Sequence, residues 1–349
     1  MIDLEEVTTV EALEALRPEW SALYERCAGA TPFQSPEWLL SWWKCFGAGQ
    51  LWVLVLRRGG RLVGLAPFFI GSLGEGAPRH VGFIGTGITD TLDLLLEPGL
   101  ESVGALRILE RLAQCSARWD LCDFQELRPD SALLTASRSA LHFRIVPQSV
   151  SPRLLLPEGT NLETILPPVH RRNLRRARRR LEAAGRFVFD RADAHTFPAL
   201  LEDFFRLHEN RWEKREGAGV LADPAIRAFH REAAAGFLRQ GALRLYGLRL
   251  GETVIASLYA FRKGSGLYCY LSGFDPEKAD YSPGALLLKH AIEEAIGEGL
   301  REVDFLRGKE PYKYLWGASD RVHYRLWIAP VASSLPQGSE EIDRSLKTG

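Results

Sequence analysis

The sequence predicts an α/β protein in which one structural unit occurs twice in tandem. Two β-hairpins with the same alternating pattern lie far apart in the chain, at residues 53–70 and 243–261. Each is followed by a helix that leads into a strand with an Asp-Phe pair, at Asp123 and at Asp304. Any two α/β domains share hairpins and helices. Here, however, the order also repeats and the offset stays at about 180 to 190 residues, which favours a duplication.

The two hairpins are predicted from their turns. The first turn is Gly59-Gly60, and a glycine pair supplies the positive φ angles that a two-residue hairpin turn requires. The second turn is Gly251-Glu252. Both turns are flanked by runs of apolar and β-branched residues, which is typical of strands.

The second copy holds the most informative stretch, residues 266–317. Its residues 267–274 alternate in polarity, which predicts a strand. Ser282 and Pro283 are typical of a helix start, with Ser282 as the capping residue, and an apolar stripe continues to Gly297. A short buried strand is expected at residues 303–306. Since backbone N–H groups and the helix dipole favour an anion at a helix N-terminus, an anion site is expected at the start of this helix.

The length of 349 residues favours two domains. We expect residues 1–157 to form the first domain and residues 158–330 the second. The polar residues 331–349 are expected to be a disordered tail.

Composition excludes several classes of protein. The 44 basic and 44 acidic residues cancel, so the whole molecule offers no general attraction to nucleic acid or anionic membranes. The five cysteines form no CxxC motif and the eight histidines no HExxH motif, which argues against a metal. No signal peptide or membrane-length apolar run is recognisable. A monomeric or homodimeric cytoplasmic enzyme that acts on a small-molecule donor and acceptor, without metal or membrane insertion, fits all of this, but so do many other proteins.

An aromatic helix is predicted at residues 36–46. It carries Trp38, Trp42 and Trp43. The simpler interpretation is a tryptophan-rich core helix. The alternative is that one or two of these rings line a pocket for an acceptor.

A basic helix follows the expected boundary between the domains. Seven of the ten residues from Arg171 to Arg180 are arginine, and an apolar stripe begins at Leu174. Gly185 is the expected stop. The arginines form a solvated face balanced by acidic neighbours, or bind phosphate, or contact an RNA backbone. The zero net charge favours the first interpretation.

Four motifs together resemble a known family. They are the DFLRGKEPYKYLWG run from Asp304, the GFDP…SPG loop from Gly273, the RRNLRRARRRL helix and the LHENRW segment. They are similar to the CelD/BcsL-like acetyltransferases, a branch of the GNAT superfamily often tied to exopolysaccharide or cellulose operons. The tandem arrangement also resembles the FemAB-type peptidoglycan aminoacyltransferases. The resemblance covers roughly residues 30–328.

This resemblance implies two GNAT-like domains, each a mixed, largely antiparallel sheet flanked by helices. It also implies direct acyl transfer from a thioester, most simply acetyl-CoA. The pantetheine arm would pair with the backbone of the splayed strand Tyr268–Phe274, which includes Gly273. The pyrophosphate would lie on the amides of Ser282, Gly284 and Ala285. The developing oxyanion would need a backbone N–H.

The sequence departs from the superfamily pattern at the pyrophosphate loop. Asp275, Glu277 and Asp280 stand there against the single cation Lys278, and Pro283 removes one amide donor. Three carboxylates repel a pyrophosphate unless they point away or pair. The first copy has no clean anion loop, so it is expected to be non-catalytic and to serve the acceptor side.

The loop that follows the Asp304 strand carries the expected catalytic residues. The resemblance implies that Tyr312 acts as a general acid. Lys313 would stabilise charge or hold a phosphate, and Asp304 or Glu310 would accept a proton. We expect Tyr312→Phe and Lys313→Ala to leave thermal stability nearly unchanged and to lower activity by about tenfold or more.

Three further residues are expected to bind substrate. Trp316 would stack on a sugar or base, and Arg307 would contribute charge. Arg211, near the end of a helix from residue 197, would face the cleft with its guanidinium. The alternatives are a salt-bridged surface loop for Arg307 and Trp316, and an exposed arginine at the negative end of a helix for Arg211.

The predicted function is transfer of an acyl group to an amine or hydroxyl of a sugar or cell-envelope precursor. Two alternatives stay open. One is a FemAB-like transfer from aminoacyl-tRNA, which would account for the arginine-rich helix. The other is a non-catalytic protein that binds a nucleotide-linked sugar in a degenerate cleft.

Overall fold

The computed structural model describes residues 1–72, 77–136, 140–213 and 220–331, and its chain divides into two compact units. Unit 1 comprises residues 1–149 and the C-terminal residues from Val322, and unit 2 comprises Val150–Arg321. This division differs from the expected one at residues 157 and 158. The expected tail at 332–349 lies outside the described residues.

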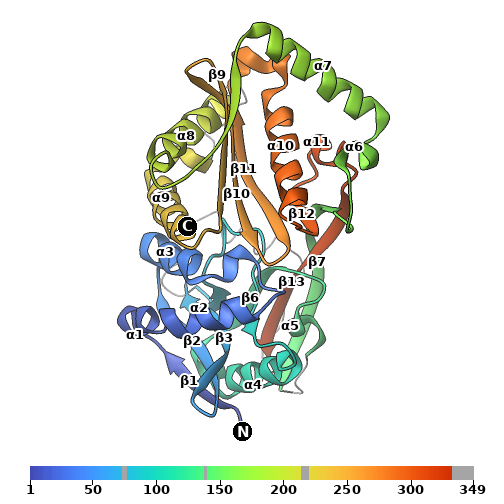
Figure 1. The fold of residues 1–349 in the computed structure, drawn as a ribbon. Helices are drawn as coiled ribbons and strands as arrows, with labels where there is room; N and C mark the ends of the chain where they lie inside the picture. Colours follow the sequence, from blue (N-terminus) through green and yellow to red (C-terminus); the bar gives the residue numbers. More distant parts are fainter. Residues whose placement is uncertain (73–76, 137–139, 214–219, 332–349) are drawn as a thin grey trace. The chain divides into compact units, whose positions relative to one another are not determined.

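Unit 1 begins with a strand and three helices and continues as a hairpin followed by single strands and helices (Figure 1). Its elements are β1 (Asp3–Val7), α1 (Val10–Ala15), α2 (Arg17–Arg26), η1 (Pro32–Gln34), α3 (Pro36–Phe46), β2 (Gln50–Arg58), β3 (Arg61–Gly71), β4 (His80–Phe83), β5 (Leu95–Leu96), α4 (Glu101–Gln114), η2 (Ser116–Arg118), β6 (Leu121–Leu127) and α5 (Ala132–Thr135). Two long strands, β7 (Leu141–Leu155) and β13 (Ser319–Pro330), have residues in both units.

The sheet of unit 1 has the strand order β1-β2-β3-β4-β6-β13, with β5 paired to β3. Helix α4 buries Ile108 and Leu112 in a core that includes Phe68 and Phe124 of the sheet. The aromatic helix α3 is also part of the packed interior. Trp38 is fully buried, and its indole N–H donates to Thr89 Oγ1 at 2.9 Å. This placement agrees with the core interpretation of α3.

Unit 2 contains the arginine-rich helix, a second hairpin and the stretch singled out by the sequence. Its elements are α6 (Leu162–Ile165), α7 (Pro168–Ala184), β8 (Phe187–Arg191), α8 (Phe197–Glu213), η3 (Val220–Ala222), α9 (Pro224–Arg239), β9 (Leu243–Leu250), β10 (Thr253–Lys263), β11 (Gly266–Phe274), η4 (Pro276–Tyr281), α10 (Pro283–Gly297), β12 (Glu302–Asp304) and α11 (Pro311–Tyr314). The strand order is β7-β12-β11-β10-β9-β8.

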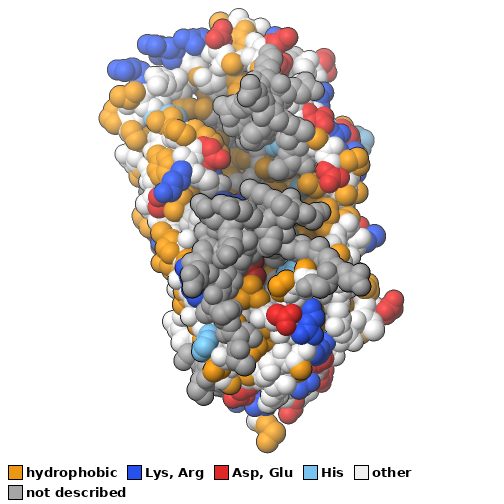
Figure 2. Space-filling model, turned by 180° about the vertical axis from the view of Figure 1, so that it is seen from behind, with side chains coloured by type: hydrophobic (Ala, Val, Ile, Leu, Met, Phe, Trp, Pro, Cys, Tyr) orange, Lys and Arg blue, Asp and Glu red, His pale blue; other side chains and the backbone are white. Residues whose placement is uncertain are grey.

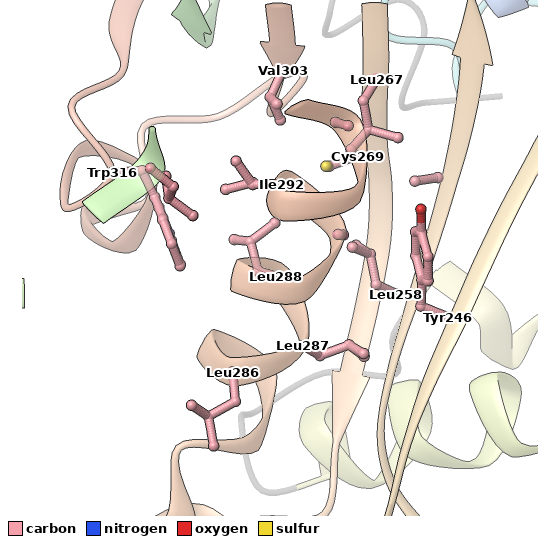
Figure 3. Close-up of a cluster of buried hydrophobic side chains, with 14 of the residues drawn as sticks. Tyr246, Leu258, Leu267, Cys269, Leu286, Leu287, Leu288, Ile292, Val303 and Trp316 are labelled. Atoms are coloured by element: carbon pink, nitrogen blue, oxygen red, sulfur yellow. The ribbon is translucent and has the colours of Figure 1, made fainter. Parts of the chain in front are cut away.

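Helices cover both faces of the sheet in unit 2 (Figure 1). Helix α10 packs on one face, where Leu287 points toward Leu258 and Tyr246 of the strands, while Leu288 and Ile292 point toward Trp316 (Figure 3). Helices α8 and α9 pack on the other face, where the ring of Phe204 lies 5.3 Å from that of Tyr259. Successive residues of β10 thus serve opposite faces, as a strand with both sides buried requires.

The sequence correctly predicted the repeated order of elements. A hairpin, a strand, a helix and a strand follow one another as β2-β3-β4-α4-β6 in unit 1 and as β9-β10-β11-α10-β12 in unit 2. In unit 1 the short strand β5 also lies between β4 and α4. Strand β4 pairs in parallel with β6, as β11 does with β12 in unit 2. The hairpin turns also lie as predicted, with φ of 57° and 78° at Gly59 and Gly60 and 58° at Gly251.

The units exchange their last strands, which explains why the division differs from the expected one. Strand β7 follows unit 1 in the chain, yet its residues Arg153–Leu155 pair with β12 of unit 2. Strand β13 follows unit 2, yet its residues Tyr324–Ile328 pair with β6 of unit 1. A simple boundary between consecutive domains cannot describe this connection.

Candidate functional site

Strands β11 and β12 separate soon after they meet. They pair in parallel only over Gly266–Tyr268 and Glu302–Asp304. Strand β11 then continues to Phe274, while β12 ends at Asp304. Among the described residues no strand pairs with β11 on this side from Cys269 to Phe274, a segment we call the open edge. An unpaired strand edge presents N–H and C=O groups that an extended ligand can pair with.

A β-bulge lies on the open edge. Opposite it on β10, Tyr259 pairs with Leu271 and Ala260 with Cys269, so Tyr270 is the extra residue. A bulge re-aims the local backbone and is common beside active sites. The amides around Tyr270 are therefore candidates for the N–H group that an oxyanion would need.

Helix α10 begins at Pro283, after the short helix η4 that follows the open edge. Ser282 stands at its N-cap position as predicted, but with φ of 47° and without a side-chain capping bond. Its carbonyl instead accepts the amides of Ala285 and Leu286, at 3.1 and 3.2 Å. A Cβ at Gly284 would meet only Phe274, at 3.8 Å, so the space before this helix end is open. The Gly284 amide and the positive end of the helix dipole remain for an anion.

The acidic loop before α10 forms the short helix η4. The Asp275 carboxylate turns into this helix and accepts the Glu277 amide at 2.9 Å. Glu277 and Asp280 are exposed, and the guanidinium of Arg180 donates to the Asp280 carbonyl at 3.0 Å. Of the three carboxylates in this loop, that of Asp275 is therefore hydrogen-bonded within η4. The contact from Arg180 also joins α7 to this loop.

Asp304 lies at the point where β11 and β12 separate, and its carboxylate is fully engaged. It is 2% exposed. Oδ1 accepts from Ser151 Oγ at 2.8 Å and from the Leu306 amide at 2.9 Å, and Oδ2 accepts from Arg321. These contacts favour a positioning role over that of a proton acceptor.

Lys313 secures the loop that follows Asp304. Its Nζ donates to the carbonyls of Leu306, Arg307 and Gly308 at 3.0, 2.9 and 3.2 Å and pairs with Glu310 at 2.9 Å. The loop needs such support because Leu306 has a φ of 57°, which is unfavourable for a branched residue. The ammonium is buried with its donors occupied, which does not fit the expected phosphate contact.

The remaining residues expected in this loop separate into exposed and buried ones. Tyr312 is 39% exposed on α11, and Arg307 is also exposed. Trp316 is 1% exposed and packs in the core near Ile292 (Figure 3), with its ring 4.6 Å from that of His170. No face of its indole is left for a sugar, so this burial does not fit the stacking role.

Two expected site residues lie elsewhere in unit 2. Gly273 faces α8, because a Cβ there would lie 2.4 Å from the His208 amide nitrogen and 2.5 Å from the Leu207 carbonyl carbon. Close packing of helix backbone on strand therefore explains this glycine. Arg211 belongs to α8, but its side chain lies outside the described part of the chain.

Burial shifts the pKa of two further groups near the open edge, Cys269 and His230. It raises the pKa of the Cys269 thiol to about 12, so a cysteine nucleophile is not available at neutral pH. On the α9 side of the sheet, burial lowers the pKa of His230 to about 3, and its imidazole stays neutral. His230 is 1% exposed, and its ring lies 5.5 Å from that of Tyr270.

Unit 1 has a buried polar cluster at the matching strand end, which sequence reasoning missed. The Asp123 carboxylate accepts two bonds from the Arg325 guanidinium, at 2.7 and 2.8 Å. Glu126, with φ of 56°, accepts from Ser149 and lies 3.3 Å from His323 Nδ1. The only sign of this cluster in the sequence was the repeated Asp-Phe pair, because Arg325 and His323 lie far from Asp123 and Glu126 in the chain.

A pocket of about 180 Å³ lies away from the open edge, between α7, β8 and α10. Its floor includes Phe189, which stacks on His290 with ring centroids 4.4 Å apart. Its charged rim is internally paired, with Glu163 contacting both Arg175 and Lys289. Arg175 and Lys289 are therefore both already paired with an acidic side chain at the rim of this pocket.

Residues 169–314 match the family described as acetyltransferase (GNAT) domain. The matched GNAT domain lies within unit 2 and contains the open edge, η4 and α10. A comparison with curated proteins finds no match. Because unit 1 repeats the order of elements of unit 2, the chain has a tandem GNAT-like fold.

Solved structures resemble the whole chain and not the GNAT domain alone. A crystal structure of FemX matches with a TM-score of 0.65 and 11% identity, covering 92% of this chain and 96% of that one. The C-terminal domain (DUF2156) of a putative lysylphosphatidylglycerol synthetase from Agrobacterium fabrum matches with a TM-score of 0.59 and 11% identity, covering 95% and 94%. L-PGS from Bacillus licheniformis matches at 0.54 and 12%, covering 82% and 87%. Identities this low establish likeness of fold alone.

Among the described residues no helix is both long and apolar enough to cross a bilayer. Within the same residues, no group of three or more His, Cys, Asp and Glu side chains is arranged to hold a metal ion.

Proposed function

We propose that the protein is an acyltransferase whose GNAT domain binds an acyl thioester, most simply acetyl-CoA. The observation that carries this proposal is the open edge of β11, whose last residue Phe274 lies beside the start of α10 at Gly284. The backbone of Cys269–Phe274 would pair with a pantetheine arm. The Gly284 amide and the helix dipole would then hold the pyrophosphate.

The proposed reaction is direct transfer to an amine or hydroxyl of a sugar or cell-envelope precursor. The acceptor atom forms a bond to the thioester carbonyl carbon, and the carbon–sulfur bond breaks. The acceptor loses its proton to a base, and the leaving thiolate takes one from a general acid. The high pKa of Cys269 supports direct transfer, since a covalent cysteine intermediate would need a thiolate.

Tyr312 is the proposed general acid. It is 39% exposed. The neighbouring Tyr314 donates its hydroxyl to Asp320 Oδ1 at 2.7 Å, which raises the pKa of Tyr314. We expect Tyr312→Phe to lower kcat by about tenfold or more and to leave KM and the melting temperature nearly unchanged. Steady-state kinetics with Tyr314→Phe as the control would measure this. Equal losses in both variants would contradict the assignment.

Calorimetric titration with acetyl-CoA tests the donor site. We expect binding with Kd roughly in the micromolar range, and a loss of at least about tenfold in Gly284→Glu, because the new carboxylate would meet the pyrophosphate. Gly284→Ala is the matched control and should bind nearly as the native protein does, since its Cβ has room. Absence of binding to all three proteins would overturn a CoA donor and favour a tRNA-borne donor or a non-catalytic cleft.

A further inference from the structure

Three arginines form a ridge on the outer side of α7. Four of the seven arginines in Arg171–Arg180 have partners: Arg171 and Arg175 contact Glu163, Arg178 contacts Glu182, and Arg180 contacts the Asp280 carbonyl. Among the described residues the other three contact no acidic group. These three, which we call the arginine ridge, are Arg172, Arg176 and Arg179.

The geometry of the helix points the arginine ridge away from the core. Residues spaced by four and three positions lie on one side of a helix, at about 100° per residue. The opposite side carries the buried His170, Leu174, Ala177 and Leu181. In Figure 2 a group of Lys and Arg side chains lies at the upper left, over the place that α7 takes in Figure 1.

Apolar side chains are exposed at the N-terminal end of this ridge. Val169 is 59% exposed, on the same side of α7 as Arg172 and Arg176. Ile165 of α6, four residues earlier in the chain, is 36% exposed. Leu315 is 50% exposed and precedes Trp316, whose ring contacts His170 in the first turn of α7. We call these three residues the apolar flank, and Figure 2 shows hydrophobic side chains directly below the basic group.

We infer that the arginine ridge and the apolar flank together dock unit 2 on an anionic lipid bilayer surface. The strength of peripheral binding grows with the apolar area buried in the bilayer surface and with the attraction of basic residues to anionic lipids. Each arginine near an anionic leaflet contributes a modest attraction, and shallow apolar side chains add to it. The inference does not depend on the identity of the acyl donor.

The neighbouring charges decide which arginines matter most. Glu163 and Glu182 are engaged by Arg175 and Arg178, so they do not neutralise the ridge. The exposed acids of η4 lie near the C-terminal half of α7, where Arg180 contacts this loop. Arg172 and Arg176, which are closer to the apolar flank, are therefore expected to carry most of the contact.

The apolar flank favours a bilayer over nucleic acid. An RNA backbone would pair with the arginines, but it offers nothing to exposed valine, isoleucine and leucine side chains. Single-stranded bases stack on aromatic side chains, and the flank has none. Lipid accommodates both parts of the surface.

Vesicle co-sedimentation of the full chain tests this inference. The vesicles contain either phosphatidylcholine alone or phosphatidylcholine with about one third phosphatidylglycerol. We expect binding to the anionic vesicles only, weakened by salt. Arg172→Glu/Arg176→Glu should weaken it by at least about tenfold. The control Arg58→Glu/Arg239→Glu makes the same change in net charge at exposed positions elsewhere and should bind almost as tightly as the native chain.

The apolar part has its own variant, Val169→Ser/Leu315→Ser, which leaves every charge in place. We expect it to weaken vesicle binding several-fold, with unchanged circular dichroism. Failure of the native chain to sediment, or equal loss in the control, would overturn the inference. So would salt-sensitive tRNA binding, measured by filter retention, that the arginine variant abolishes and the apolar variant leaves intact, because that pattern identifies a nucleic-acid surface.

Discussion

Replacing Lys313 by alanine is expected to lower the free energy of unfolding by about 3 kcal/mol. The buried ammonium holds three consecutive carbonyls, those of Leu306, Arg307 and Gly308. Without it these acceptors lose their donor, and the left-handed conformation of Leu306 loses its support. This expectation replaces the sequence-based one, in which Lys313→Ala leaves stability unchanged.

Urea denaturation of Lys313→Ala and Lys309→Ala would measure this effect. Lys309 is exposed in the same loop, so its removal should change stability by no more than about 0.5 kcal/mol. Lys313→Met adds a second comparison, because it keeps most of the aliphatic stem and removes only the charge. If Lys313→Ala were as stable as Lys309→Ala and yet inactive, the lysine would belong to the chemistry and not to the loop.

Replacing Gly273 by alanine is expected to destabilise the GNAT domain by about 3 kcal/mol. The new Cβ would lie 2.4 Å from the His208 amide nitrogen, and backbone atoms of α8 cannot rotate out of its way as a side chain can. Either α8 moves away from β11 or the strand bends. Since β11 carries the open edge, we expect donor binding to weaken together with stability.

Gly284→Ala is the matched control for Gly273→Ala. The Cβ at Gly284 has only Phe274 near it, at 3.8 Å, and alanine favours helix over glycine by up to about 1 kcal/mol. Thermal denaturation of the two variants should therefore show opposite or clearly unequal shifts. A Gly273→Ala protein that melts with the native one would mean that α8 does not pack as closely on β11 as described.

The features predicted well from the sequence are those whose signals are local. The hairpin turns at Gly59-Gly60 and Gly251 and the start of α10 at Pro283 each depend on residues within a few positions. The strand that carries the open edge was predicted from its local alternation, whereas its use by a donor was only implied by the family resemblance. The repeated order of elements then followed from two sets of local signals at a constant offset.

The roles of polar residues were harder to predict, because they depend on distant partners. Asp304 and Lys313 looked like reactive groups in a loop, but Ser151 and three backbone carbonyls occupy them. The burial of Trp316 depends on α7 and α10, which lie elsewhere in the sequence. Sequence composition alone does not distinguish a polar loop that binds a ligand from one whose polar groups hydrogen-bond to one another.

The exchange of β7 and β13 has a consequence for biosynthesis. Residues 1–149 emerge from the ribosome first, but β6 can pair with β13 only after all of unit 2 has been synthesised. Until then Asp123 lacks Arg325, and closing the core around it would bury an uncompensated charge. The first half of the nascent chain therefore cannot complete its fold on its own, and we expect residues 1–149 to stay sensitive to proteases until β13 has been made.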